Sequence, residues 1–186
     1  LVAGLGNQSV TPDSLGPRTV NNLSVSQNET GLKAISPGVM AQTGMETARI
    51  LSGIIREIKP DLVIAIDALA ARSIRRLGTT IQLTDTGIHP GSGVGNHRHS
   101  LTKETLGIPV LAVGVPTVVG AAAIVHDTIS ALTGVLASEE ATKNTGKWIE
   151  NMNPEDQYRM IRELLEPEFG SLYVTPPDID QRVKQL

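Results

Sequence analysis

The sequence predicts an α/β fold, a three-layer sandwich in which helices cover both faces of a mainly parallel, mixed β-sheet. Short apolar runs alternate along the chain with segments of helical periodicity, which is the pattern of strand, helix, strand units. Aromatic residues make up only 2% of the 186 residues, so the core must come from Ile, Leu, Val and Ala. A chain of this length fits a single domain, which we expect to span residues 1–186.

The N-terminal half supplies the first strand, helix, strand unit. Residues 1–5 form a buried apolar strand, and a helix begins at Thr11, which caps it, with the following proline in the first helical position. Residues 21–38 are polar and lack a clear period, which indicates a loop. Apolar residues at helical spacing predict a helix over 44–58, and the next strand covers 62–66.

The C-terminal half continues this alternation. The predicted elements are a helix over 68–77, a strand over 79–83, a strand over 109–116 and an Ala-rich helix over 118–132. Residues from about 135 to 186 are expected to decorate the same domain, with a helix starting at Pro154 and a short strand over 172–174. The chain starts inside an apolar strand without a methionine, so we expect residues before Leu1 to be missing.

Composition narrows the classes of function. The net charge of −3 gives no reason to expect direct binding to nucleic acid, since a binding domain shows a basic patch or stripe. The cluster Arg72, Arg75, Arg76 is interpreted as a solvated helix face. The absence of cysteine excludes disulfides and thiolate ligands, and no stretch approaches the ~20 apolar residues that span a bilayer. We therefore expect a soluble cytoplasmic protein.

Two aspartates follow apolar strands. Asp13 comes shortly after the first strand, Asp67 comes after the second, and 53 residues lie between them. Because the carboxyl ends of parallel strands share one sheet edge, where ligands bind, the two side chains can meet there. Two carboxylates in one cleft can keep one proton between them, so that one acts as an acid while the other takes a proton from water. The same pair could instead hold a divalent cation that activates the water.

Each aspartate also has a purely structural interpretation. An acid in the first turn of a helix, such as Asp13, is favoured by the helix dipole. Asp67, at a predicted strand to helix junction, could serve only as an N-cap.

A glycine-rich segment from Asp85 to Asn96 reaches the same sheet edge, and its glycines and proline indicate a loop. Asp85 and His89 in this loop, together with Asn7, are candidates for accessory roles in the cleft. His97 and His99 have a spacing that would suit metal ligands, but a pair of histidines without a third partner is a weak signal.

Six ordered motifs carry a family resemblance over nearly the whole chain. They are Gly4-Leu5-Gly6-Asn7, Thr11-Pro12-Asp13-Ser14-Leu15-Gly16-Pro17, Ser36-Pro37-Gly38-Val39-Met40, Asp67-Ala68-Leu69-Ala70-Ala71-Arg72-Ser73, the segment Asp85 to Asn96, and Gly114-Val115-Pro116-Thr117-Val118-Val119. Together they resemble the germination proteases of spore-forming bacteria. The stretch between Pro17 and Ser36 is shorter than we expect for that family.

The resemblance implies an endopeptidase that degrades small acid-soluble spore proteins during germination, in the cytoplasm of the spore core. It also implies a zymogen with an N-terminal propeptide, which is absent here, and a homotetramer. The implied sheet is similar to that of hydrogenase maturation proteases, whose acidic metal-contacting positions correspond to Asp13 and Asp67. On this resemblance the two residues are the catalytic pair of an atypical aspartic peptidase that needs no cofactor.

Three alternatives stay open. A metal-dependent peptidase would use Asp13, Asp67 and His89 as ligands. A non-catalytic module would use the same acids to cap helices or to hold a regulatory ion. Peptidyl-tRNA hydrolase shares the opening Gly-Leu-Gly-Asn segment, but that likeness ends after four residues.

Overall fold

The fold was determined as a computed structural model of all 186 residues, which describes residues 1–25, 31–91, 99–138, 151–169 and 172–185. The strands are β1 (Val2–Gly4), β2 (Ala34–Ile35), β3 (Val63–Ala71), β4 (Gln82–Thr84), β5 (Val110–Gly120) and β6 (Tyr173–Val174). The α-helices are α1 (Leu15–Asn22), α2 (Met40–Thr43), α3 (Thr47–Ile58), α4 (Lys103–Leu106), α5 (Ala121–Ser138), α7 (Pro154–Phe169) and α8 (Ile179–Gln185). Two short 3-10 helices are η1 (Thr11–Asp13) and η2 (Ile74–Arg76).

Within the described ranges, one six-stranded sheet forms the centre of the molecule, with the order β2-β1-β3-β5-β4 and with β6 paired to β5. The pairs β1 with β2, β1 with β3 and β3 with β5 are parallel, whereas β4 and β6 run antiparallel to β5. This mainly parallel, mixed sheet confirms the predicted fold class.

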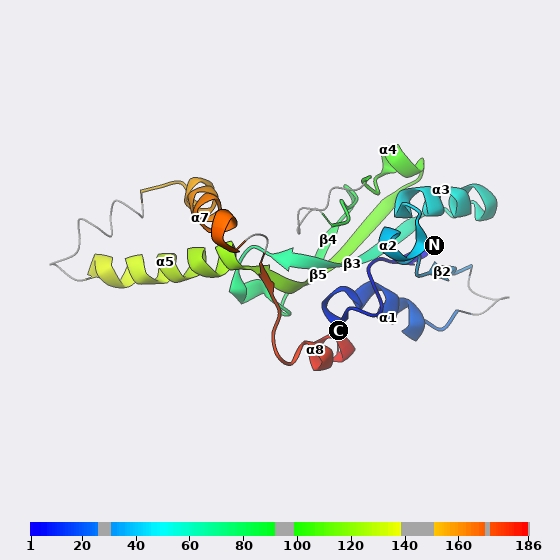
Figure 1. The fold of residues 1–186 in the computed structure, drawn as a ribbon. Coiled ribbons are helices and arrows are strands. Elements are labelled where there is room, and N and C mark those ends of the chain that lie inside the picture. The colour runs from blue at the N-terminus through cyan, green and yellow to red at the C-terminus, as the bar shows by residue number, and fades with distance from the viewer. Residues whose placement is uncertain (26–30, 92–98, 139–150, 170–171, 186) are drawn as a thin grey trace.

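Helices cover both faces of the sheet (Figure 1). On one face, Leu51 and Ile55 of α3 pack against Val63 and Ala65 of β3 in the larger core cluster. On the other face, α1 and α8 cover the sheet, and their cluster is made up of Leu15, Val115, Ile179 and Val183. These apolar contacts make the three layers, and they are aliphatic as the composition predicts.

Several details of the predicted elements are wrong. The helix predicted over residues 118–132 begins instead at Ala121, because β5 continues to Gly120. The helix predicted over residues 68–77 is absent, because β3 continues to Ala71, paired with β5 across a register shift between Leu69 and Ala70. Helix propensity in this Ala-rich segment is overridden by the pairing partner that β5 supplies. The predicted loop over 21–38 contains β2, and η1 has Val10 rather than Thr11 as its N-cap residue.

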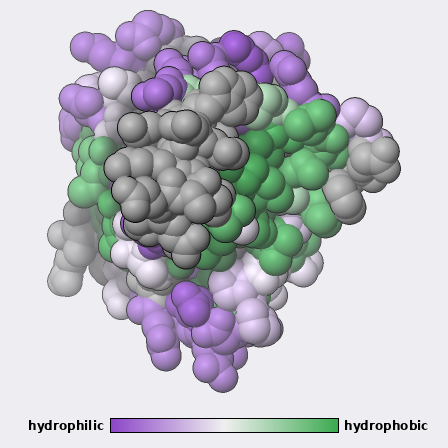
Figure 2. All heavy atoms as spheres, turned by 90° about the vertical axis from the view of Figure 1, so that its left-hand side faces the viewer, coloured by the Kyte–Doolittle hydropathy of each residue, from purple (hydrophilic) through white to green (hydrophobic). Residues whose placement is uncertain are grey.

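Helices α5 and α7 extend from one end of the sheet and are called the arm below (Figure 1). Figure 2, which views the molecule from that end, shows hydrophobic side chains gathered on one side of it. Among the arm's side chains whose burial is described, the exposed large hydrophobics include Leu132, Met160 and Leu164. Among the described residues, no helix is both long and apolar enough to cross a membrane.

Candidate active site

A cavity of about 780 Å³ opens at the carboxyl end of β1 and β3. Its lining includes Asp13, Asp67 and His89, which come from three separate segments of the chain. The structure thus brings the two predicted aspartates and the predicted histidine to one cavity.

Asp67 occupies the interior of β3 rather than its end. It is only 6% exposed and stands opposite Gly114 of β5 in the sheet register. Its Oδ1 accepts a hydrogen bond of 2.9 Å from the backbone N–H of Ala68. The interpretation of Asp67 as a helix N-cap is therefore wrong, because no helix follows it. The side chain continues the buried row of Val63 and Ala65 and adds a carboxylate to the cavity wall.

Asp13 is fixed by the turn between β1 and η1. Its Oδ2 accepts a hydrogen bond of 2.7 Å from the backbone N–H of Asn7. Gly6, in the middle of this turn, has a φ of 109°, and a Cβ there would lie well under 3.0 Å from the Asp13 carbonyl oxygen. Only glycine accepts both this backbone conformation and this close approach. The Gly-Leu-Gly-Asn segment therefore serves to place Asp13.

The sheet register explains how the two aspartates converge. Strand β1 pairs with β3 through Gly4 and Ile66, and the N–H of Leu5 donates a 2.7 Å hydrogen bond to the carbonyl of Ile66. The backbone just after β1 therefore lies beside Asp67, and this same backbone carries Asp13 against Gly6. The predicted meeting at one sheet edge follows from ordinary parallel pairing.

The accessory candidates have different positions. His89 lines the cavity, whereas Asp85 is exposed and is not part of the lining. Asn7 holds Asp13 through its backbone N–H, and its side-chain oxygen accepts hydrogen bonds of 2.9 Å from the Ser9 N–H and from Nε2 of Gln42. Its side chain therefore stabilises the turn. The remainder of the glycine-rich segment, from Ser92 to Asn96, lies outside the described residues.

The structure describes only one of the two remaining histidine candidates. His97 lies outside the described residues, and His99 binds Glu46 through both its backbone N–H and its ring Nδ1. These two hydrogen bonds hold the pKa of the Glu46 carboxyl below its ordinary value. Among the described residues, no three His, Asp or Glu side chains lie close enough together to bind a metal ion.

The cavity lining also includes residues that the sequence interpretation did not assign to it, among them Arg72, Arg76 and Thr117. Arg72 directly follows β3 and Arg76 belongs to η2, so the predicted α-helix is absent there. The arginines are nevertheless exposed, as their interpretation as solvated side chains expects. Thr117 is a single hydroxyl in an otherwise apolar strand, and its side chain is 1% exposed. A lone polar residue inside a buried apolar run is the signal that could have identified it.

Fold and cavity together define an α/β protein whose mainly parallel sheet carries a cavity lined by two aspartates at its carboxyl edge. The germination protease family model matches residues 1–148, and the chain belongs to that family. The chain is 50% identical over its full length to the germination protease of Caldanaerobacter subterraneus subsp. tengcongensis and 41% identical to that of Priestia megaterium. It spans 61% and 62% of the length of these two relatives.

A solved structure of a NiFe hydrogenase maturation protease, HycI from Thermococcus kodakarensis, is also similar to this chain. The match has a TM-score of 0.42 and 21% sequence identity, and it covers 62% of this chain and 72% of the other.

Proposed function

We propose that this chain is the peptidase domain of an endopeptidase that initiates degradation of small acid-soluble spore proteins during germination. The observation that supports this proposal most is that Asp13 of η1 and Asp67 of β3 line one cavity in a chain of the germination protease family. The relatives' name, germination protease, is consistent with a protein substrate in spores.

In the proposed mechanism the two aspartates activate a water molecule for attack on the peptide carbonyl. One carboxylate takes a proton from the water, and the other, in its protonated form, gives a proton to the departing amide nitrogen. This atypical aspartic mechanism balances without an added group, because the proton removed from water replaces the one donated. His89, which also lines the cavity, would orient the water or the substrate, and Asn7 would hold Asp13 through its backbone N–H.

Conservative variants of the two aspartates test this proposal. We expect Asp13→Asn and Asp67→Asn each to lower cleavage of a small acid-soluble spore protein at least about 100-fold, because each amide lacks the acid or base function. Asp61→Asn is the matched control, since Asp61 is exposed and lies before β3, away from the cavity lining. Near-normal turnover by either folded cavity variant would reject the assignment. An intact substrate after long incubation with the wild-type protein would favour a non-catalytic module.

The metal-dependent alternative uses the same cavity residues Asp13, Asp67 and His89, so it needs its own test. We expect activity to persist after exhaustive chelation of divalent cations, because the proposed proton transfers involve side chains and water alone. Loss of activity on chelation and its return with added metal would support the alternative.

We further propose that the protein acts in the cytoplasm of the spore as a homotetramer. The exposed hydrophobic side chains of the arm support self-association, since exposed apolar patches are typical of interfaces. Replacing Leu132 and Leu164 by Gln is expected to shift the protein toward monomer in light scattering. An unchanged mass would remove the arm from the proposed interface.

A further inference from the structure

Thr117 occupies a β-bulge in β5, next to the cavity. Across the β3 and β5 pair, Leu69 stands opposite Pro116 and Ala70 stands opposite Val118, so Thr117 is an extra residue without a partner in β3. A bulge turns the side chain of its extra residue out of the regular alternation, and bulges are frequent beside active sites. This irregularity gives the Thr117 hydroxyl a direction that a regular strand would not give it.

The Thr117 hydroxyl holds η1. It donates a hydrogen bond of 2.6 Å to the backbone carbonyl of Pro12, the residue directly before Asp13. The side chain is 1% exposed, so a hydroxyl without this acceptor would be buried at a cost. The bond therefore fixes the height of η1 above the sheet, and with it the position of the Asp13 backbone.

The C-terminal segment supports the same contact from the other side. Thr175 donates a 2.9 Å hydrogen bond to the backbone carbonyl of Thr117. Ile179 and Val183 of α8 then pack with Leu15, two residues after Asp13. These residues lie beyond position 148, where the family-model match ends.

We propose that Thr117 is a positioning residue for Asp13, and that Thr175 and α8 hold Thr117 and η1 in place. We call this series of contacts, from Thr175 through Thr117 and Pro12 to Asp13, the relay. It rests on the proposed function, because its consequence for catalysis requires that Asp13 be part of the reacting pair.

Steady-state kinetics of two variants separate positioning from substrate contact. Thr117→Val removes the hydroxyl at nearly constant volume, and we expect kcat to fall about 10-fold or more with KM within about twofold of wild type. Thr117→Ser keeps the hydroxyl and should restore most of kcat. Unchanged kcat in Thr117→Val, or a raised KM with unchanged kcat, would overturn the proposal. If Thr117→Val does not fold, Thr175→Val replaces it, with a smaller expected fall in kcat.

A double-mutant cycle tests whether Thr117 acts through Asp13. In the Asp13→Asn background, Thr117→Val should reduce the residual activity no further, because the residue it positions has lost its function. If Thr117→Val instead lowers the activity of the Asp13→Asn variant by the same factor as it lowers that of the wild type, its effect is a general structural one. This result would contradict the relay.

Amide hydrogen exchange at Asn7 gives a readout independent of catalysis, because this N–H donates to the Asp13 carboxylate. Exchange should be faster in Thr117→Val than in wild type. The matched control is Thr128→Val, whose hydroxyl binds only the Ile124 carbonyl within α5 among the described residues. Unchanged Asn7 exchange in Thr117→Val would overturn the positioning proposal. Failure of the wild-type protein to cleave substrate would count against the proposed function, and Asn7 exchange would then decide the positioning inference alone.

Discussion

The region around the cavity and the arm differ in the kind of contact that stabilises each of them. Around the cavity, backbone packs directly on backbone, since a Cβ on Gly4, Gly6 or Gly16 would lie well under 3.0 Å from backbone atoms of the facing segment. The arm instead depends on side chains. In the described part of the chain, its buried apolar contact with the sheet is a small cluster around Ala71, Val119 and Ala123.

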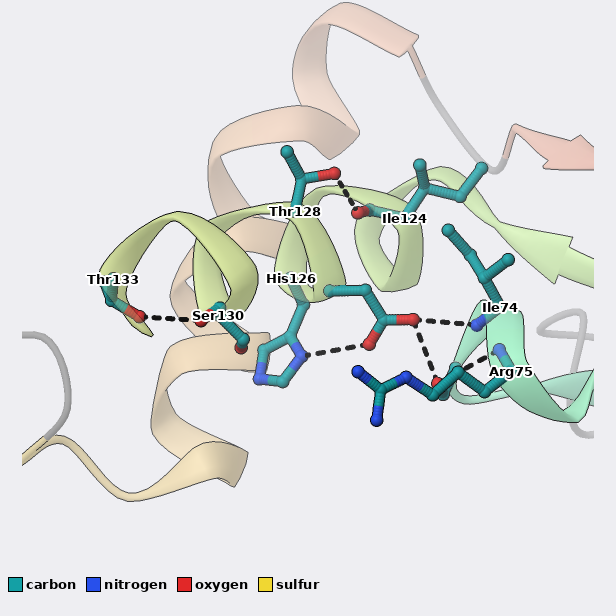
Figure 3. Close-up of polar contacts among 9 residues, drawn as sticks. Ile74, Arg75, Ile124, His126, Thr128, Ser130 and Thr133 are labelled. Atoms are coloured by element: carbon teal, nitrogen blue, oxygen red, sulfur yellow. Dashed lines mark hydrogen bonds and ion pairs between the residues drawn. The ribbon is translucent and has the colours of Figure 1, made fainter. Parts of the chain in front are cut away.

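A few polar contacts join the arm to the turn after β3. Oδ2 of Asp127 in α5 accepts hydrogen bonds from the Ser73 hydroxyl at 2.9 Å and from the Ile74 N–H at 2.8 Å. Figure 3 shows His126 and Ile74 at the two ends of this group of contacts. His126 also packs edge-on against Tyr158 of α7, with ring centroids 6.2 Å apart. The contrast teaches that the backbone that positions Asp13 leaves no room for an added Cβ at these glycines, whereas the arm can lose contacts one at a time.

The largest expected effect tests the intolerance of the cavity region. Gly16→Ala places a Cβ against the backbone of Leu5 and Ile66, which cannot move without shifting β1, so we expect a loss of about 3 kcal/mol in the free energy of unfolding. Gly53→Ala in α3 is the matched control, because its Cβ would meet nothing within 4 Å and should add about 0.5–1 kcal/mol. Urea denaturation measures both. Equal free energies of unfolding for the two variants would contradict the proposed difference between the regions.

A smaller effect is expected from the attachment of the arm. Asp127→Ala leaves the Ser73 hydroxyl and the Ile74 N–H without their acceptor, which should cost about 1–2 kcal/mol in the free energy of unfolding. Asp127→Asn keeps one acceptor oxygen and should cost less. Thermal denaturation compares the two variants. A loss in Asp127→Ala as large as that in Gly16→Ala would mean that the arm is as tightly integrated as the cavity.

The smallest effect concerns pH and the contact between Glu46 and His99. Hydrogen bonds from His99 lower the folded-state pKa of Glu46, so their contribution to stability is present above pH 4.5 and is lost as the pH falls through the lowered value. Glu46→Gln should therefore flatten the decline of stability between pH 5 and pH 3 slightly, as followed by circular dichroism at about one-pH-unit intervals. If the stability of Glu46→Gln declined more steeply with falling pH than that of the wild type, this explanation would be contradicted.

Local sequence patterns predicted those parts of the fold whose burial is periodic. The strands over 1–5, 62–66 and 109–116, and the helix over 44–58, correspond to β1, β3, β5 and α3. Convergence of Asp13 and Asp67 followed from the rule that parallel strands end at one edge. What remained hidden depends on partners distant in sequence. The extension of β3 to Ala71 requires β5, whose residues are more than 40 positions away.

The same reason explains the cavity residues that the sequence did not identify. From the sequence, Arg72 and Arg76 are interpreted as surface charges. The structure shows that both also line the cavity. Thr117 gains its role from a bulge, and a register shift between two strands leaves no mark in the local composition. The acids stood out because charge is rare within or shortly after an apolar run, whereas the contacts of Thr117 with η1 depend on the fold.

The central claim, that Asp13 and Asp67 act as one unit in one cavity, is tested most directly by combining the two substitutions. Cleavage of a small acid-soluble spore protein by the Asp13→Asn, Asp67→Asn double variant should be no weaker than by the more impaired single variant, because either loss already disables the pair. If the fold loss of activity in the double variant equals the product of the fold losses in the two single variants, the two carboxylates contribute independently. This result would contradict the account.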